Sequence, residues 1–462
     1  MRYDVNARPS LAVQVLLGLQ HVFAAFGGVI VVPIIVSNAL NFDVATSTAL
    51  ISGSILAAGL ATIVQSLGIG PVGARLPSLM GTDVTFSAPA IAVGQAYGMP
   101  GIIGAILAGG VIESVLSFFT KHIIRFFPKV VAGVVITLIG LTLLANSIDW
   151  LGGGANAADY GSMRNILVGL VVMAITLVLS YYGRGFFQTA SILIGMVIGY
   201  LICIPLGMVN FSGIAAAPLF SLPNILANGV SFHLSAIIAF LPAFLVGVIG
   251  TVGRIKAIEG VAGIPESDQR VQRAILADGV TTVGAGLVGG LTNTTFAQNI
   301  GLLSITKVVS RYVTIMAGII LTILGLFPAF AAVIHAMPQP VLGGAGVIMF
   351  GMIAVAGINI LREVEFDNRN MLIIAISLGF GLGVAFRPAI LSQFPEQVRM
   401  IFSSGITTGT IVAILLNLIL HAGRRNDALN LDAAGEYGEL PVTMPPVPTP
   451  PATMPPKAGG AP

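Results

Sequence analysis

Charged residues and cysteine are scarce in this 462-residue chain. Asp, Glu, Lys and Arg make up 8% of it, against roughly a quarter of a soluble protein. The single cysteine, Cys203, excludes an internal disulfide and lies in an apolar run, where it is read as a small buried hydrophobe. The sequence contains no metal-ligand spacing, no Cys/His cluster and no phosphate-binding loop. The lack of a nucleotide site argues against ATP-driven transport by this chain alone.

Apolar residues are correspondingly abundant. They make up 56% of the chain, and the mean hydropathy is +0.98. Apolar runs recur from residue 11 to residue 420, many close to the ~20 residues that cross a bilayer as a helix. The sequence therefore predicts an all-α polytopic membrane protein. The first run lacks a small-residue cleavage site, so we expect a retained helix rather than a signal peptide.

The apolar runs divide into fourteen expected spans: 11–36, 45–68, 78–97, 100–119, 129–147, 165–182, 189–208, 232–257, 273–291, 293–306, 311–334, 340–358, 370–387 and 400–420. Cytoplasmic loops carry an excess of Lys and Arg, which tests the count. With the N-terminus in the cytoplasm, 18 of the 21 Lys and Arg fall inside, Arg254 among them, and 3 fall outside, namely Arg164, Arg387 and Arg399. We therefore expect an integral plasma (inner) membrane protein with both termini cytoplasmic. In such a protein the net charge of +3 does not indicate nucleic-acid binding.

The composition changes near the C-terminus. The stretch PVTMPPVPTPPATMPPKAGGAP is too rich in proline for a helix or a sheet. We expect residues 423–462 to form a disordered cytoplasmic tail and residues 1–422 to form a single transporter unit.

Fourteen spans divide into two halves of seven, and an odd-numbered repeat places its two copies in opposite orientations. The third span of each half is irregular: PSLMGTDVTFSAPAIAVG (77–94) and GGLTNTTFAQNIGLLSIT (289–306). Irregular backbone at membrane depth is tolerated only where it is buried in protein or lines a cavity. In both we expect a short extended strand followed by a half-helix whose N-terminus points free N–H groups at a binding site.

Uncharged polar residues gather in NTTFAQNIGLLSIT (293–306). Gln298 and Asn299 each offer an amide donor and acceptor, which match a flat heterocycle carrying lactam N–H and C=O groups. The alternative is a structural role, since Asn, Gln, Ser and Thr also hydrogen-bond across spans.

Three carboxyl groups fall within expected spans: Asp83, Asp278 and Glu113. A carboxylate is costly in a membrane, so each must be paired, hydrated or protonated. Each is a candidate to carry a coupling proton or to accept local hydrogen bonds.

Two further polar features lie in the spans. Gln20 and His21 are adjacent in the first span and are candidates to face a cavity or to be satisfied structurally. Arg254 follows the run Gly250-Thr-Val-Gly in the eighth span. It is either an anchor at the cytoplasmic interface or a charge in the site.

The run QNIGLLSITK (298–307) resembles the signature of the nucleobase–ascorbate transporters, also called nucleobase:cation symporter family 2. That signature reads Gln or Glu, Asn, any residue, Gly, any four residues, Thr, then Arg or Lys. Its fixed positions are filled by Gln298, Asn299, Gly301, Thr306 and Lys307. The family's Gln-His pair is matched at 20–21, and the resemblance runs along residues 10–420. The wording AQNIGLLSITKVVSR is similar to the purine branch, which carries xanthine or urate.

The resemblance implies two inverted repeats of seven spans. Spans 1–4 and 8–11 would form a core domain, and spans 5–7 and 12–14 a gate domain that mediates homodimerisation. The core would move like an elevator against the gate, coupled to H⁺ or Na⁺ and with no other cofactor. The imported purine would be held by Gln298, Asn299 and the backbone of Asp83, Val84 and Phe86, with Phe86 stacked on the ring.

The chain departs from the family pattern in the eighth span. Relatives usually have a Glu that binds the base's N–H groups, where this chain has Gly250. Arg254 follows four residues later, and Asp83 stands where relatives usually have a small or hydroxyl residue. We expect Arg254 to pair with Asp83 or to attract an anionic substrate such as urate.

Three alternatives stay open. The first is a permease for uracil or another nucleobase. The second is a small-anion transporter of the same architecture, which Arg254 favours and the Gln-Asn signature opposes. The third is a receptor-like membrane protein that does not transport, which the internal repeat opposes.

Overall fold

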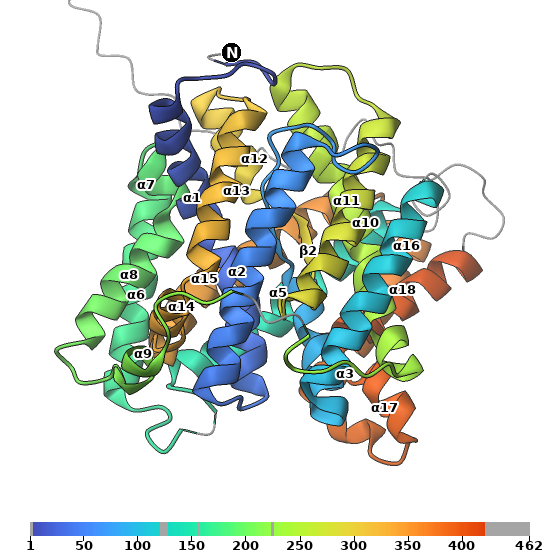
Figure 1. Cartoon of the computed structure of the whole chain (residues 1–462). Helices are drawn as coiled ribbons and strands as arrows, with labels where there is room; N and C mark the ends of the chain where they lie inside the picture. The colour runs from blue at the N-terminus through green and yellow to red at the C-terminus, as the bar shows by residue number, and fades with distance from the viewer. Residues whose placement is uncertain (1–2, 121–127, 156, 223–225, 421–462) are drawn as a thin grey trace, which may run out of the picture.

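The structure is a computed structural model that describes residues 3–120, 128–155, 157–222 and 226–420. The predicted tail at 423–462 lies outside the described residues. The described chain is almost entirely helical (Figure 1). The first half contains α1 (Leu11–Ala39), α2 (Val44–Leu67), β1 (Met80–Thr82), η1 (Val84–Phe86), α3 (Ser87–Leu116), η2 (Ser117–Phe119), α5 (Lys129–Leu151), α6 (Met163–Tyr182), α7 (Phe186–Thr189), α8 (Ser191–Cys203) and α9 (Ser212–Ala216).

The second half repeats this order in outline. It contains α10 (Leu234–Ala262), α11 (Asp268–Leu287), β2 (Asn293–Thr295), α12 (Gln298–Thr306), α13 (Arg311–Gly325), α14 (Pro328–His335), α15 (Gln339–Arg362), α16 (Asn368–Phe386), η3 (Pro388–Leu391), α17 (Glu396–Phe402) and α18 (Gly405–Leu420). Helix ends follow ordinary capping chemistry. Asp43 accepts a hydrogen bond from the Thr46 N–H at 2.8 Å at the start of α2. Gly263 adopts a left-handed conformation after α10.

Eight helices in the described ranges are long and apolar enough to cross a membrane, or nine if the bent pair α13 and α14 is one span. The number differs from the fourteen expected segments for identifiable reasons. The predicted spans 78–97 and 100–119 are joined in α3, which is broken at Gly98, where φ is 65°. The expected span 311–334 is bent by 83° between α13 and α14. The helices α8 and α18 are apolar but shorter.

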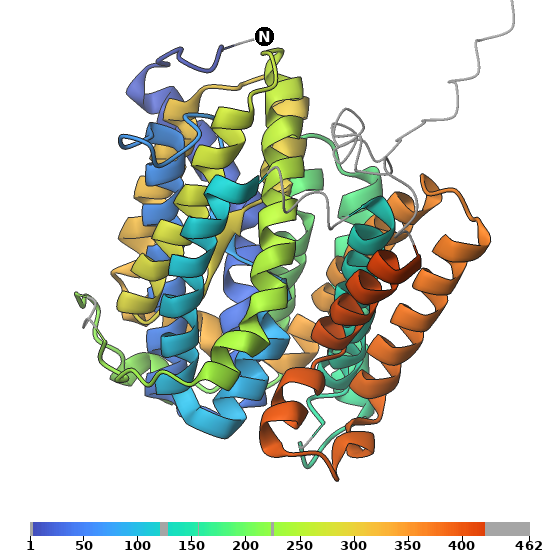
Figure 2. The same cartoon turned by 90° about the vertical axis from the view of Figure 1, so that its right-hand side faces the viewer.

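The helices pack in two groups. In the first, α2 packs against α13, α11 against α3, α1 against α13, and α10 against α3. In the second, α5 packs against α15, α16 against α18, and α6 against α8 and α15. Figure 2 shows α5, α16 and α18 together on one side of the molecule. Contacts between the groups are fewer and involve α10 with α17 and α18, and α1 with α8.

Two short strands lie inside the first group. They pair antiparallel, with Met80 opposite Thr295, Gly81 opposite Thr294 and Thr82 opposite Asn293. All six residues are buried. Each strand precedes a helix, η1 and α3 after β1 and α12 after β2. The extended backbone thus occupies protein interior, where its polar groups are satisfied by the partner strand.

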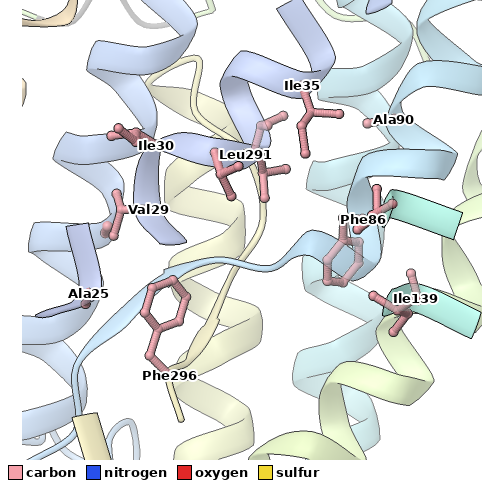
Figure 3. Packing of buried hydrophobic residues seen from close by; sticks show 14 of the residues in the cluster. Ala25, Val29, Ile30, Ile35, Phe86, Ala90, Ile139, Leu291 and Phe296 are labelled. Carbon is pink, nitrogen blue, oxygen red and sulfur yellow. The ribbon is translucent and has the colours of Figure 1, made fainter. Parts of the chain in front are cut away.

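Apolar side chains from α1 and the strand regions enclose this ladder. Val29, Ile30 and Phe296 pack around it, and Leu291 precedes β2 (Figure 3). Gly81 is required by this packing, because a Cβ at its position would lie 2.5 Å from the Phe296 ring. The absence of a side chain at Gly81 therefore lets β1 lie directly on the ring.

Candidate functional site

The candidate site is built around the short β1–β2 ladder. A three-residue strand is only about 10 Å long, so the helices that follow the two strands start close together. Asp83 connects β1 to η1 and is 7% exposed. Its Oδ1 accepts hydrogen bonds from the Thr85 N–H at 2.9 Å and the Thr85 hydroxyl at 2.7 Å. Asp83 therefore acts as the N-cap of η1, which fixes the direction of its second oxygen.

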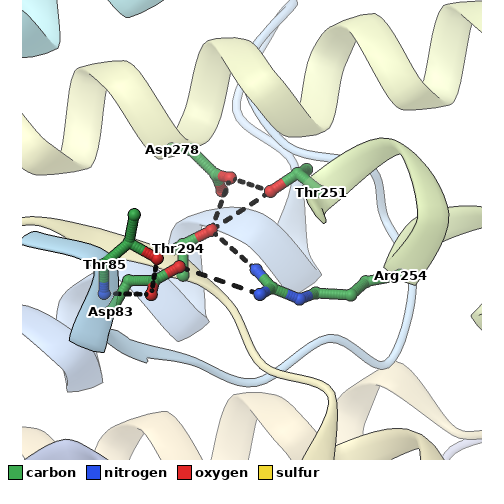
Figure 4. Close-up of polar contacts among 6 residues, drawn as sticks. All are labelled: Asp83, Thr85, Thr251, Arg254, Asp278 and Thr294. Atoms are coloured by element: carbon green, nitrogen blue, oxygen red, sulfur yellow. Dashed lines mark hydrogen bonds and ion pairs between the residues drawn. The ribbon is translucent and has the colours of Figure 1, made fainter. Parts of the chain in front are cut away.

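That second oxygen faces Arg254. Arg254 Nη2 lies 3.7 Å from Asp83 Oδ2, and its Nη1 donates to Thr294 Oγ1 at 3.1 Å (Figure 4). The predicted pairing of Arg254 with Asp83 is confirmed. The head group of Arg254 reaches from α10 to β2 and η1, so it is a charge in the site. A burial of about three quarters of the side chain is consistent with this position, since its exposed fraction is 24%.

Asp278 joins the same network from α11. The hydroxyl of Thr251 donates to Asp278 Oδ2, and that of Thr294 does so at 3.3 Å. Gln65 Nε2 contacts Asp278 Oδ1 at 3.4 Å and Thr295 Oγ1 at 3.2 Å. Asp278 is fully buried, and these donors satisfy both of its oxygens. Within the described ranges, no group of three His, Cys, Asp or Glu residues is arranged to hold a metal ion.

Gly250 lies one helical turn before Arg254 on α10. A Cβ built on Gly250 would be 3.2 Å from the guanidinium carbon of Arg254. The arginine head therefore fills the space in which a larger residue at position 250 would begin. This geometry accounts for the expected redistribution of charge, because the absence of a side chain at Gly250 leaves room for the Arg254 guanidinium.

Asn299 and His21 come together where α12 packs against α1. Asn299 is 1% exposed, and its Nδ2 donates to the Pro77 carbonyl at 2.5 Å. His21 on α1 is 3% exposed and lies beside Asn299. The two side chains are close enough to hydrogen-bond each other, and Asn299 Oδ1 and His21 Nδ1 have no other hydrogen-bond partner among the described residues. Two buried polar atoms therefore remain available at the start of α12.

The other residues predicted to bind the base lie on α12, α1 and η1. Gln298 begins α12, but its side chain lies outside the described residues. Gln20 is half-buried on α1. Val84 is half-buried in η1, and Phe86 is 3% exposed with its ring edge-on to Phe244 at 4.7 Å.

Of the other signature residues, Lys307 and Thr306 have structural roles in α12, whereas Gly301 has none in the packing. Lys307 is exposed, has φ 56° and ends α12, with its N–H bonded to Leu303 O. The Thr306 hydroxyl donates to Leu302 O at 2.8 Å within the same helix. A Cβ on Gly301 would meet nothing within 4 Å, so helix packing does not require this glycine.

Sequence reasoning missed three members of the network. Gln65 lies in the apolar run of α2, where one amide gives no sign of its three contacts with α11 and β2. Thr251 sits inside the quoted run Gly250-Thr-Val-Gly, and a hydroxyl beside a glycine was the available signal. Thr85 follows Asp83 by two residues, which is the spacing of an Asx turn.

The apolar helices and the buried polar network between two broken segments define a polytopic membrane transporter rather than an enzyme. Comparison with known sequences gives the family. The profile of the permease family (Xan_ur_permease) matches residues 12–390. A Clostridium perfringens protein with a provisional purine-permease name, CPE0397, is 54% identical over 90% of this chain and 92% of its own length. The uric acid permease PucJ of Bacillus subtilis is 36% identical over 92% and 95%.

A xanthine permease of Bacillus subtilis is 35% identical, over 87% of this chain and 92% of its own length. The chain therefore belongs to the permease family of nucleobase–ascorbate transporters.

Solved structures share the fold at low identity. The transmembrane domain of the cyanobacterial bicarbonate transporter BicA gives a TM-score of 0.59 at 13% identity, covering 89% of this chain and 99% of that chain. Inward-facing murine SLC26A9 gives 0.60 at 12% identity, covering 91% and 69%.

Proposed function

We propose that this chain imports a purine base, xanthine or urate, in symport with a cation, and that the cation is H⁺. The names of the relatives support the substrate class, since they include a uric acid permease and a xanthine permease. The observation that carries the proposal is the buried pair of Asn299 and His21, which come together where α12 meets α1 and whose Oδ1 and Nδ1 atoms have no other partner among the described residues. Such atoms are costly unless a ligand or water engages them.

The base is held between η1 and α12. Gln298 and Asn299 contact its N–H and C=O groups, and His21 contributes a ring nitrogen, with Gln20 beside it. The backbone of Asp83, Val84 and Phe86 supplies further polar groups, and the Phe86 ring packs against the base. An uncharged amide site can hydrogen-bond the N–H and C=O groups of the ring without adding fixed charge at membrane depth.

The charged network positions these groups. Arg254 holds Asp83 and Thr294, and so ties η1 to β2. Asp278 ties α11 to β2 and to Thr251 of α10. Asp83 or Asp278 is a candidate coupling carboxylate within this network, and Gly250 provides the space for Arg254.

We infer that the full architecture has fourteen spans in two inverted repeats of seven. The packing supports this inference because contacts occur in matched pairs. The pair α2 and α13 corresponds to α11 and the second half of α3, and α1 with α13 corresponds to α10 with α3. In the other group, α6 with α8 corresponds to α16 with α18. The pairing of β1 with β2 lies where the repeat axis would pass.

The two packing groups correspond to the proposed core and gate domains. The sparse contacts between them suit an elevator movement of the core against the gate. A homodimer through the gate domain and a plasma (inner) membrane location with both termini cytoplasmic complete the proposal.

A small-anion substrate is less well supported. Arg254 is the charge that favours an anion, but Asp83 already faces it at 3.7 Å. An entering anion would have to displace a carboxylate that is held by Thr85. Uptake of uracil in place of xanthine or urate would keep the site and change only the ring.

Uptake into proteoliposomes tests the function. Radiolabelled xanthine, urate, uracil and ascorbate are supplied with and without a pH gradient. We expect xanthine or urate to accumulate, with faster uptake when the outside is acidic. Gln298→Ala should abolish uptake while leaving the melting temperature unchanged, and Ser304→Ala on the same helix is its control. If none of the four compounds enters or competes, the nucleobase function is wrong.

A further inference from the structure

Glu113 is a buried carboxyl group that the proposed site does not use. It lies on α3, is 2% exposed and is enclosed by α10 and α11. The helices approach closely around it. A Cβ on Gly110 would lie 2.8 Å from the Gly279 carbonyl of α11, and a Cβ on Gly109 would overlap the Phe244 ring of α10. This packing excludes water from the carboxyl group on two sides.

Glu113 lies near the Phe86 ring, which we propose packs against the base. A Cβ built on Gly247 of α10 would be 3.8 Å from Glu113 Oε1 and 3.9 Å from the Phe86 ring. The carboxyl group and the aromatic ring therefore both approach Gly247. The other oxygen, Oε2, is buried and has no hydrogen-bond partner among the described residues.

The charges around Glu113 determine which acid can be neutral. Asp278 faces it from α11 and Asp83 from the start of η1. Both of these carboxylates are satisfied as anions, Asp278 by two hydroxyls and Gln65, and Asp83 by Thr85 and Arg254. Arg254 is a single positive charge and is already opposed by two negative ones. An ionised Glu113 would add a third, with one oxygen unpartnered, which a buried site disfavours.

We propose that Glu113 is protonated in this conformation and is the proton-carrying residue of the transport cycle, which rests on the proposed transport of a purine base. As a neutral acid, Glu113 donates its O–H to a carbonyl oxygen of a base packed on Phe86. A buried acid kept neutral so that it can donate a hydrogen bond has precedent in proteins. As a carboxylate it would repel that carbonyl oxygen, so the base and the proton bind together.

The proton step is simple. On the side where the base leaves, the O–H bond of Glu113 breaks and the proton passes to water, leaving the electron pair on the carboxylate. The carboxylate takes a proton from water on the outer side before the next base binds. Because the coupling is thermodynamic, the base raises the affinity for the proton as much as the proton raises the affinity for the base.

Infrared spectroscopy tests protonation without any substrate. The purified wild-type protein should show the carbonyl stretch of a buried protonated carboxylic acid. Glu113→Gln should remove this band and Glu113→Asp should shift it. Glu363→Gln, which removes an exposed carboxylate paired with Lys129, should leave the band in place. Persistence of the full band in Glu113→Gln would overturn the proposal.

Transport measurements test the role of that proton. In Glu113→Gln we expect exchange of internal for external base to stay within about two-fold of wild type, because the amide still donates a hydrogen bond, and accumulation driven by a pH gradient to fall about ten-fold or more. Glu113→Asp should recover gradient-driven accumulation with a displaced pH profile. Unchanged accumulation in Glu113→Gln, or equal loss of exchange and accumulation in a folded protein, would overturn the proposal. Failure of the wild type to carry any base would instead refute the proposed function, while the infrared band still decides the protonation of Glu113.

Discussion

The guanidinium of Arg254 lies over Gly250 and reaches Asp83 across the end of the β1–β2 ladder. Its carbon is 3.2 Å from where a Cβ at position 250 would be, and its Nη2 is 3.7 Å from Asp83 Oδ2. The size and charge of residue 250 therefore determine whether Arg254 can hold Asp83. Through its contacts with Asp83 and Thr294, Arg254 of α10 joins η1 of the first half of the chain to β2 of the second.

Gly250→Glu should reduce uptake of the base about ten-fold or more, because a carboxylate beside Arg254 would compete with Asp83 for the guanidinium. Gly250→Ala adds volume without charge, so its uptake should stay within about three-fold of wild type. Initial uptake rates in proteoliposomes measure both. Equal losses in the two variants would show that space alone, and not charge, matters at this position.

Removing one member of the Arg254–Asp83 pair should destabilise the protein more than removing both. Either Asp83→Asn or Arg254→Gln leaves a buried charge without its partner, at a cost of about 3 kcal/mol or less, given that Arg254 is partly exposed. The double variant should recover a coupling energy of about 0.5–3 kcal/mol. Thermal unfolding of the detergent-purified protein follows the cycle. Strictly additive effects would mean that the contact at 3.7 Å contributes nothing to stability.

The sequence was most informative where polar, charged or helix-breaking residues occur in segments expected to cross a membrane. Gly, Pro and Thr around Met80–Thr82 and Asn293–Thr295 indicated extended backbone, and the structure has a three-residue strand in each segment. The missing side chain at Gly250 and the nearby Arg254 indicated a displaced charge, which now faces Asp83. Both features stand out in the sequence because their residue types are unusual in an apolar run.

Contacts between helices that are far apart in the chain could not be predicted from the sequence. Nothing local shows that Gln65 on α2 reaches Asp278 on α11, because the two are brought together only by packing. The sequence also could not predict which apolar runs form one continuous helix. A hydropathy window cannot distinguish a break at Gly98 that stays within one helix from the 83° bend between α13 and α14.

Gly81→Ala should destabilise the ladder, because the added Cβ would lie 2.5 Å from the Phe296 ring and 2.9 Å from Val29. Forcing extra volume into a filled core typically costs about 1–3 kcal/mol. We therefore expect a lower melting temperature and a loss of base uptake. Gly301→Ala is the matched control, since a Cβ there meets nothing within 4 Å and should leave stability unchanged or slightly raised. A melting temperature for Gly81→Ala equal to that of wild type would contradict the packing described here.

Asn299→Ala should weaken base binding and also loosen the start of α12. The substitution removes the donor to the Pro77 carbonyl, a contact of 2.5 Å, together with the free oxygen assigned to the base. Loss of the buried hydrogen bond should cost about 1–3 kcal/mol of stability, and binding of xanthine or urate should fall about ten-fold or more. Ser304→Ala is the control, because that hydroxyl bonds only within α12, to Ile300 O. Equilibrium binding and thermal unfolding are measured on the same preparations. A loss of stability with unchanged affinity would assign Asn299 to helix anchoring alone. Recognition of the base would then fall to other groups, because removing an amide that contacts the base must change the affinity as well as the stability.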